Sequence, residues 1–250
     1  MTKEKSLYEL NEEATRYYQS LLKSEENEEV IEYFNKIKTT MDNVKRFRLG
    51  YAKTAEKGLL DHLKSLGYSD DRIIDAGLAE RNEDGETKDV FRNRLIIPVI
   101  DDEDRVIGFS GRSLDEEDPI YLNSRSTDVF DKSKSLFGLN IAKDASADYM
   151  VLCEGYMDVI TLNQAGFDMA IATLGVKFTV DQANLLKKYT NKVFVCFDTD
   201  DVGNKGADSA ISIIIENGMK GLKIDLSPFK DPMDMITKES ADAFRERLGC

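Results

Sequence analysis

The sequence predicts an α/β protein in which a mixed α+β amino-terminal part precedes a part built on a mostly parallel sheet covered by helices. Three observations support this fold class. Apolar residues in the first part recur at three- and four-residue steps, which is typical of amphipathic helices. In the middle, two β-like runs flank an acidic turn. From about residue 149, short apolar runs alternate with helical segments, which implies parallel strands with helices on both faces.

Helices are expected to dominate the amino-terminal part. The clearest apolar stripe covers residues 7–21, and a similar pattern occupies residues 26–37. A further helix over 55–66 is expected to stop at Gly67, because glycine commonly ends helices. Ser69 can cap a short helix beyond it.

A hairpin and then an alternating α/β region are expected in the rest of the chain. The β-like runs over 94–100 and 105–110 are joined by the acidic turn, as in a hairpin. Later strands are expected over 149–153, 169–173, 192–197 and 221–226. The helices between and after them are expected over 156–165, from 179 onward, over 203–217 and over 241–248.

The composition excludes several classes of protein. Of the 250 residues, 41% are hydrophobic, which is enough for a substantial core. No apolar run approaches the length of a membrane span, and the first residues lack the apolar stretch of a secretory signal, so we expect a cytoplasmic protein with no membrane partner. The single histidine and three scattered cysteines exclude a conventional zinc site. The net charge of −13 argues against nucleic-acid binding unless a local basic surface exists.

Acidic residues follow three of the expected strands. They are Glu154 after the first, Asp198 and its neighbours after the third, and the run that begins at Asp231 after the fourth. The carboxyl ends of parallel strands meet at one edge of a sheet, so these acids are expected to converge. Clustered carboxylates repel one another and need a cation, and oxygen ligands suit Mg²⁺ or Mn²⁺. This pattern indicates phosphoryl or nucleotidyl transfer.

Each acid also has a simpler interpretation. A single acid after a strand is more often a helix cap or a loop residue, and only the joint occurrence favours a metal site. A phospho-acceptor receiver domain has acidic strand ends too. It would need a lysine at a later strand end, whereas Lys223 lies near the start of a strand.

The same residues resemble a known family. Glu154-Gly-Tyr-Met-Asp158, Ala172-Thr-Leu-Gly175 and Asp198-Thr-Asp-Asp-Val-Gly203 look like the TOPRIM signature of bacterial DnaG-type primases. Upstream motifs resemble the amino-terminal part of the primase polymerase core in the same order. They are Phe91-Arg-Asn-Arg-Leu-Ile-Ile-Pro98, Gly108-Phe-Ser-Gly-Arg112, Tyr121-Leu-Asn-Ser124 and Asp131-Lys-Ser-Lys-Ser-Leu-Phe-Gly-Leu139. The resemblance covers roughly residues 7–236.

The resemblance implies a role for each matching position. The catalytic residues would be Glu154, Asp198 and Asp200. The metal ligands would be drawn from Glu154, Asp158, Asp198, Asp200, Asp231 and Asp234. The basic groove for nucleic acid or nucleotide would be lined by Arg92, Arg94, Arg112, Tyr121, Asn123, Ser124, Lys132 and Lys134. Domains are expected over 1–147 (the primase-type amino-terminal subdomain), 148–237 (the TOPRIM subdomain) and 238–250 (a terminal helix).

The implied activity is synthesis of short RNA primers on single-stranded DNA with Mg²⁺ or Mn²⁺. The partners would be the DNA template, ribonucleoside triphosphates, the RNA primer and, through domains absent from this chain, the replicative helicase. The protein would act in the bacterial cytoplasm or nucleoid. It would be either a shortened primase or a compact primase-like protein of a phage or mobile element.

The sequence departs from the family pattern at several positions. Met233 replaces the second acid of an Asp-Pro-Asp motif, with Asp234 directly after it, and Ile120 stands where lysine is common. Two alternatives therefore remain open. A TOPRIM nuclease explains the acids but not the motifs between residues 92 and 139. A catalytically idle module that binds nucleic acid or a replication partner is consistent with the lost acid.

Overall fold

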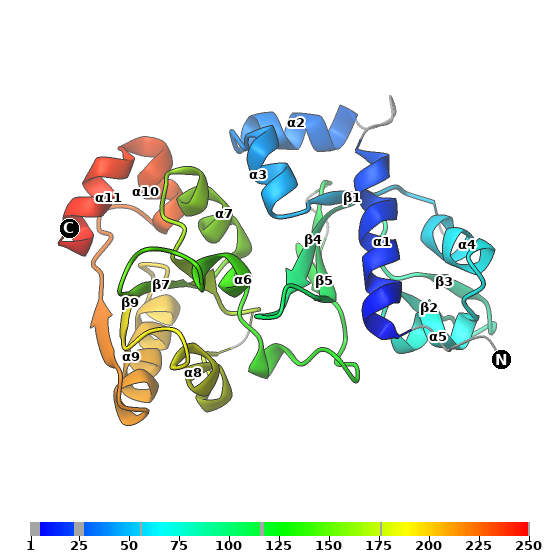
Figure 1. The fold of residues 1–250 in the computed structure, drawn as a ribbon. Coiled ribbons are helices and arrows are strands. Elements are labelled where there is room, and N and C mark those ends of the chain that lie inside the picture. Colours follow the sequence, from blue (N-terminus) through cyan, green and yellow to red (C-terminus); the bar gives the residue numbers. More distant parts are fainter. Residues whose placement is uncertain (1–5, 23–27, 56, 116–117, 176, 250) are drawn as a thin grey trace. The chain divides into compact units, whose positions relative to one another are not determined.

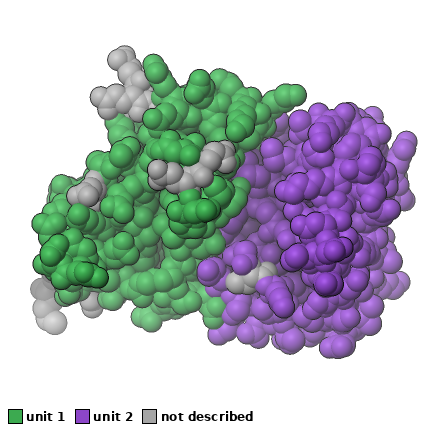
Figure 2. Space-filling model, turned by 180° about the vertical axis from the view of Figure 1, so that it is seen from behind, with its two compact units in different colours: residues 1–100, 104–131 green, residues 101–103, 132–250 purple. Residues whose placement is uncertain are grey.

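The computed structural model describes residues 6–22, 28–55, 57–115, 118–175 and 177–249, so the predicted start of the second helix at residue 26 lies outside the described residues. The chain forms two compact units (Figure 2). Unit 1 comprises residues 1–100 and 104–131, and unit 2 comprises residues 101–103 and 132–250. No helix within the described residues is long and apolar enough to cross a membrane.

Unit 1 begins with the predicted helices. In α1 (Leu7–Leu21), Ser6 and Glu9 form a capping box, and the apolar stripe packs against the sheet of this unit. The next helices are α2 (Glu28–Lys36), α3 (Met41–Arg46), α4 (Gly58–Ser65) and α5 (Asp70–Asp75). Helix α3, which begins at its cap Thr40, has too few residues to show an apolar period and was not predicted.

The predicted hairpin forms the centre of an antiparallel sheet in unit 1 (Figure 1). The strand order is β1-β4-β5-β6, and the hairpin is the β4–β5 pair. The bounds are β1 (Gly50–Ala52), β4 (Arg94–Ile100), β5 (Val106–Ser113) and β6 (Tyr121–Asn123). A second pair, β2 (Ala79–Arg81) and β3 (Thr87–Asp89), forms a separate small sheet.

Unit 2 contains the predicted parallel sheet, which confirms the fold class. Its order is β10-β9-β7-β8, and every pair within it is parallel. The strands are β7 (Met150–Cys153), β8 (Ala170–Ala172), β9 (Lys192–Cys196) and β10 (Lys220–Lys223). The last strand ends earlier than the predicted 221–226, so Lys223 lies at its end and not near its start as we expected.

Helices cover both faces of this parallel sheet. The main ones are α7 (Tyr156–Gln164), α8 (Val180–Leu186) and α9 (Asp201–Glu216). In the order β10-β9-β7-β8, the connection from β7 to β8 moves toward one edge of the sheet. The connections from β8 to β9 and from β9 to β10 move toward the opposite edge. Because such crossovers are right-handed, α7 lies on one face and α8 and α9 lie on the other. Helix α10 (Pro232–Lys238) then packs on α7, and α11 (Ala241–Leu248) packs on α10.

Residues 132–147 pack with unit 2, although we predicted a domain boundary at residue 147. This segment contains the 3₁₀ turn η1 (Lys132–Lys134) and α6 (Leu139–Ala142). Phe137 and Ala172 exchange two backbone hydrogen bonds of 2.9 and 3.0 Å, which attaches the segment to the outer edge of β8. The compact units therefore divide earlier in the chain than the sequence motifs suggest.

Candidate active site

The two central strands of the parallel sheet deliver the first two acids of the site. Glu154 directly follows β7, and Asp198 lies just beyond β9. These strands are neighbours, with Cys153 in register with Cys196. The backbone N–H of Asp198 consequently donates a 3.0 Å hydrogen bond to Oε1 of Glu154. The structure thus brings together the two residues that the strand-end rule singled out.

Asp200 belongs to the same turn and caps α9. Its Oδ1 accepts hydrogen bonds from the backbone N–H groups of Val202 (3.0 Å) and Gly203 (2.7 Å). Its Oδ2 has no hydrogen-bond partner within the described residues. The fold therefore fixes the direction of this carboxylate while leaving one oxygen for a ligand.

Gly203 allows α9 to begin this close to the acids. A Cβ atom at this position would lie 2.3 Å from the backbone oxygen of Asp198 and 2.8 Å from Oε1 of Glu154. Both distances are shorter than atomic contacts allow, so any side chain would push the turn away from the glutamate. The glycine of the Asp198–Gly203 motif is thus a geometric requirement of the site.

Lys230 and Asp231 complete the charged cluster. The Nζ atom of Lys230 lies 3.5 Å from Oδ2 of Asp198 and 3.5 Å from Oδ2 of Asp231. Asp231 also caps α10, since its Oδ1 accepts the backbone N–H of Asp234 at 2.7 Å. Sequence reasoning missed this lysine, although it directly precedes the acidic run that we singled out.

Asp158 is in a different situation from the other predicted ligands. Its side chain is buried, with 7% of its surface exposed. Oδ2 accepts the backbone N–H of Gly155 and Oδ1 accepts that of Met233, both at 3.2 Å. Asp158 therefore joins the beginning of α7 to the beginning of α10, the helix that Asp231 caps.

Asp234 also has partners for both of its oxygens. Oδ1 lies 2.7 Å from Nζ of Lys238, and Oδ2 accepts the backbone N–H of Lys230 at 3.2 Å. The hydrogen bond from Lys238 is the main reason that the pKa of Asp234 is lowered. The acid that follows Met233 is thus paired within its own helix.

Three acids of the site have raised pKa values, mainly because they are buried. Burial raises the pKa of Glu154, and the negative charges of Asp198 and Asp200 add to this effect. The pKa of Asp198 is likewise raised by burial, with Lys230 opposing the shift. For Asp158, burial and the charge of Asp231 raise the pKa to about 8. A cation placed among these groups would relieve their repulsion.

The donor set fits a hard divalent cation, although the protein alone does not form a closed site. Within the described ranges, no three His, Cys, Asp or Glu side chains already meet as metal ligands. All the available donors are carboxylate oxygens, which Mg²⁺ and Mn²⁺ prefer. Magnesium typically binds one or two carboxylates and completes its shell with waters and substrate phosphates, so an open arrangement suits it.

Two of the predicted groove arginines are engaged within unit 1. Arg94 is 9% exposed, and its Nη1 donates to the backbone oxygens of Gly111 (3.0 Å) and Pro119 (2.9 Å). The guanidinium carbon of Arg112 lies 4.3 Å from the ring centroid of Tyr33. Arg92, by contrast, is exposed and lines a pocket of about 590 Å³ in unit 1.

The other predicted groove residues are divided between the units. Ser124 is buried, and its Oγ accepts the backbone N–H of Phe109 at 3.0 Å, so it fastens β5 to the segment after β6. Tyr121 is 37% exposed and Asn123 is half-buried. In unit 2, Lys132 is half-buried and Lys134 is exposed, both on η1. A shared groove for all eight residues stays a prediction.

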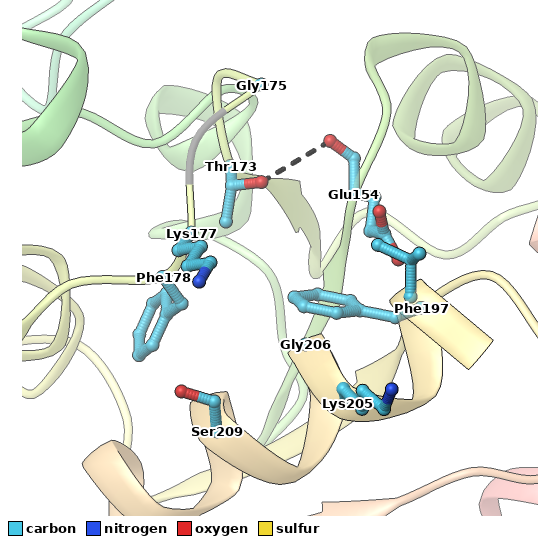
Figure 3. Close-up of a pocket in the computed structure, with 10 residues that line it drawn as sticks. Glu154, Thr173, Gly175, Lys177, Phe178, Phe197, Lys205, Gly206 and Ser209 are labelled. Carbon is cyan, nitrogen blue, oxygen red and sulfur yellow. Dashed lines mark hydrogen bonds between the residues drawn. The ribbon is translucent and has the colours of Figure 1, made fainter. Parts of the chain in front are cut away.

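A pocket that the sequence did not reveal lies beside Glu154 (Figure 3). Its volume is about 460 Å³. Figure 3 shows Phe178 and Phe197 on either side of the space, with Thr173 near Glu154 and Ser209 on the helix below. The hydroxyl of Thr173 donates to the backbone oxygen of Glu154 at 3.5 Å. Only the match at Ala172-Thr-Leu-Gly175 pointed to this loop.

A parallel sheet of order β10-β9-β7-β8, with a glutamate after β7 and a pair of aspartates after β9, defines a Toprim-type protein. Residues 151–236 match the family model described as Toprim-like. Residues 17–143 match the model of the amino-terminal domain of the DNA primase catalytic core. The chain belongs to the family of DNA primase catalytic cores.

Named relatives agree with this assignment. The chain is 40% identical over 239 residues to a DNA primase of Clostridium acetobutylicum. The matched region covers 95% of this chain and 40% of the relative. It is 33% identical to a DNA primase of Escherichia coli K12, covering 97% of this chain and 43% of the relative. The chain thus spans about two fifths of the length of these relatives.

Solved structures show the same fold. A DnaG primase catalytic domain bound to single-stranded DNA is 33% identical, with a TM-score of 0.90, over 97% of this chain and 78% of that chain. The RNA polymerase domain of Mycobacterium tuberculosis primase DnaG is 25% identical, also with a TM-score of 0.90, over 100% of this chain and 84% of that chain.

Proposed function

We propose that this chain is the catalytic core of a DNA primase, which joins ribonucleotides into short RNA primers on single-stranded DNA. The observation that carries the proposal is the meeting of Glu154 with the segment that contains Asp198 and Asp200, in a chain of the primase family. The related structure with bound single-stranded DNA supports the proposed template.

Metal dependence is part of the proposal, since Toprim primases are generally metal-dependent. Asp198, Asp200 and Asp231 would hold Mg²⁺ or Mn²⁺ through their oxygens. Such an ion, when bound, neutralises phosphate charge and lowers the pKa of an attacking hydroxyl. Asp158 and Asp234 would position the segments that carry this cluster and would not bind the ion directly, because their own oxygens accept hydrogen bonds from backbone and lysine N–H groups.

Glu154 is the proposed proton acceptor. In each step the 3′-hydroxyl oxygen of one nucleotide forms a bond to the α-phosphorus of the next triphosphate. The bond from that phosphorus to the pyrophosphate oxygen breaks, and the hydroxyl proton passes to Glu154. Burial raises the pKa of this carboxyl, which makes it a stronger proton acceptor than an exposed glutamate.

Exposed cations would hold the polyanionic partners. Arg92 in unit 1 and Lys134 in unit 2 are exposed members of the predicted basic set. They would contact phosphates of the template, the RNA primer or ribonucleoside triphosphates. A replicative helicase is a further proposed partner. The bacterial relatives support a site of action in the bacterial cytoplasm or nucleoid.

The test is primer synthesis on single-stranded DNA with four ribonucleotides and Mg²⁺ or Mn²⁺. Glu154→Gln and Asp198→Asn should each reduce synthesis by at least about 100-fold, a loss typical of removing a catalytic acid or base. Circular dichroism should show an unchanged fold. Glu216→Gln, which alters an exposed acid at the far end of α9, is the matched control and should retain full activity.

Three results would contradict the proposal. Full activity in Glu154→Gln would show that this glutamate does not take part in the reaction. Cleavage of labelled single-stranded DNA with metal but without nucleotides would favour the nuclease instead. If the unmodified chain binds neither Mg²⁺ nor Mn²⁺ at millimolar concentration, it is an idle binding module.

A further inference from the structure

The pocket beside Glu154 has the size of a ligand site and lies within unit 2. Its volume of about 460 Å³ falls within the range of small-molecule pockets. Thr173 and Phe178 line it from the segment between β8 and α8. Phe197 lines it from the turn after β9, and Val202 lines it from the first turn of α9. These two segments flank the catalytic glutamate, so a ligand in the pocket would lie next to the reacting groups.

The pocket offers apolar and aromatic surface. Phe178 and Phe197 are largely buried and supply its walls. Val202 is 78% exposed, the highest value of any large hydrophobic residue in the described part of the chain. Val202 belongs to the same pocket lining as Phe178 and Phe197, so the three side chains together give the pocket an apolar wall. Bases and riboses are the parts of a nucleotide that such a surface recognises.

Two lysines give the same pocket a positive rim. Lys177 and Lys205 are exposed, and neither makes a hydrogen bond or ion pair with any described residue. Because the chain has a net charge of −13, two unpaired cations at one pocket indicate a site for an anionic ligand. Together with the apolar walls, they match the chemistry of a nucleoside triphosphate.

We propose that this pocket holds the first nucleotide of the primer, the ribonucleoside triphosphate whose 3′-hydroxyl attacks the incoming one. The inference rests on the proposed function. Synthesis that starts without a primer must hold two nucleotides at once, and the first has no preceding base in the new strand on which to stack. The apolar walls supply that stacking surface, which is worth roughly 1–3 kcal/mol per base in other proteins.

The reaction assigns a place to each end of this nucleotide. Its 3′-oxygen bonds to the α-phosphorus of the second triphosphate, whose pyrophosphate leaves, and the proton passes to Glu154. Its own 5′-triphosphate is not consumed and stays at the end of the product, where Lys177 and Lys205 bind it. A primer that is already long presents no triphosphate to this rim.

The experiment separates starting a primer from extending one, using the whole 250-residue chain. The double variant Lys177→Gln/Lys205→Gln should raise the KM for the first nucleotide of dinucleotide synthesis about tenfold, with a smaller change in kcat. Extension of a pre-annealed RNA primer should change less than about threefold. Val202→Ser should show the same selectivity. The matched control Lys220→Gln removes an exposed positive charge at the start of β10 and should change neither reaction.

The outcomes distinguish this inference from the proposed function. If the unmodified chain makes no primer, the proposed function fails and the inference fails with it. If the unmodified chain makes primers and the variants start them with an unaltered KM, only the inference is overturned. An equal loss of starting and extension would also overturn it, because that result assigns the lysines to general nucleotide binding.

Discussion

Gly203 controls how closely the first turn of α9 approaches Glu154. Gly203→Ala would place a methyl group against the backbone oxygen of Asp198, an atom that cannot rotate away. We expect a loss of roughly 1–3 kcal/mol in the free energy of unfolding, as for other overpacked positions. Primer synthesis should fall by more than about tenfold, because Asp198 and Asp200 would move away from Glu154. Thermal melting and activity assays measure the two effects.

Ser212→Ala is the control for this change. It lies on the exposed side of the same helix, so it tests a small substitution away from the acids. A variant at position 203 that melts and reacts like the control would contradict the steric argument.

At the residue scale, the sequence predicted the positions of those acids that directly follow a strand. Glu154 and Asp198 could be paired because neighbouring parallel strands end at a common edge. The burial of Asp158 and the bridging position of Lys230 depend on how α10 returns to pack on α7. That contact joins segments far apart in the chain, and no local pattern encodes it. The pocket walls Phe178 and Phe197 were missed for the same reason.

Among the secondary-structure elements, α4 begins without a cap of its own. Lys57 makes no capping hydrogen bond, and Asp89 from β3 takes that role. The carboxylate oxygens of Asp89 accept the backbone N–H groups of Leu59 and Leu60, both at 2.8 Å. Its side chain is 3% exposed, and burial raises its pKa to about 6.

This cap makes the stability of unit 1 depend on pH. An acid whose pKa is raised in the folded state binds more protons there than in the unfolded chain. Its ionisation therefore lowers the free energy of unfolding as the pH rises from about 4 to above 6. Relative to Asp89→Asn, the wild-type protein should lose about 1 kcal/mol between pH 5 and 7.5. Urea denaturation at the two pH values measures this difference, and a constant difference would contradict it.

Gln182 fastens η1 to α8. It is fully buried, and its Nε2 donates to the backbone oxygens of Lys132 (3.0 Å) and Ser135 (2.8 Å). Gln182→Leu should destabilise the fold by roughly 1–3 kcal/mol, because two part-buried carbonyl groups lose their donor. Hydrogen exchange should show faster opening of residues 132–135. Gln164→Leu on α7 provides a comparison, and equal effects would argue against this specific role.

Element lengths explain which parts of the fold the sequence could predict. Helix α1, the β4–β5 hairpin and the helices α7, α8, α9 and α11 are long enough to show a period or a cap, whereas α6 and α10 were not predicted. Strands β1, β2, β3 and β6 contain three residues each, too few for alternation to be recognised, whereas the equally short β8 was predicted from its apolar run between two expected helices. Strands β1 and β6 form by pairing with the longer β4 and β5, whereas β2 and β3 pair with each other.

At the scale of the whole molecule, an acidic protein is proposed to bind a polyanion. Few cations of the predicted set are exposed, since Arg94 is buried and Arg112 lies on Tyr33. If about three phosphates are neutralised, the logarithm of the affinity for single-stranded DNA should fall with the logarithm of salt concentration with a slope of about −2. Fluorescence anisotropy across a salt series measures this slope.

One substitution tests which cations contribute. Arg92→Gln should make the slope shallower by about 0.7, the contribution of one phosphate contact to a single strand. Lys220→Gln should leave the slope unaltered. An identical slope in the Arg92 variant would remove this residue from the interface.

The edge strand β10 also affects whether two copies of the protein can associate through their sheets. Parallel sheets offer unpaired N–H and C=O groups at their margins, and another chain can add to such a margin. Strand β10 is short and mostly exposed, and Lys220 and Lys223 stand at its two ends. Lys223 is ion-paired with Asp208 at 2.9 Å, so the exposed charge of Lys220 is the one that hinders a second copy from pairing with this margin.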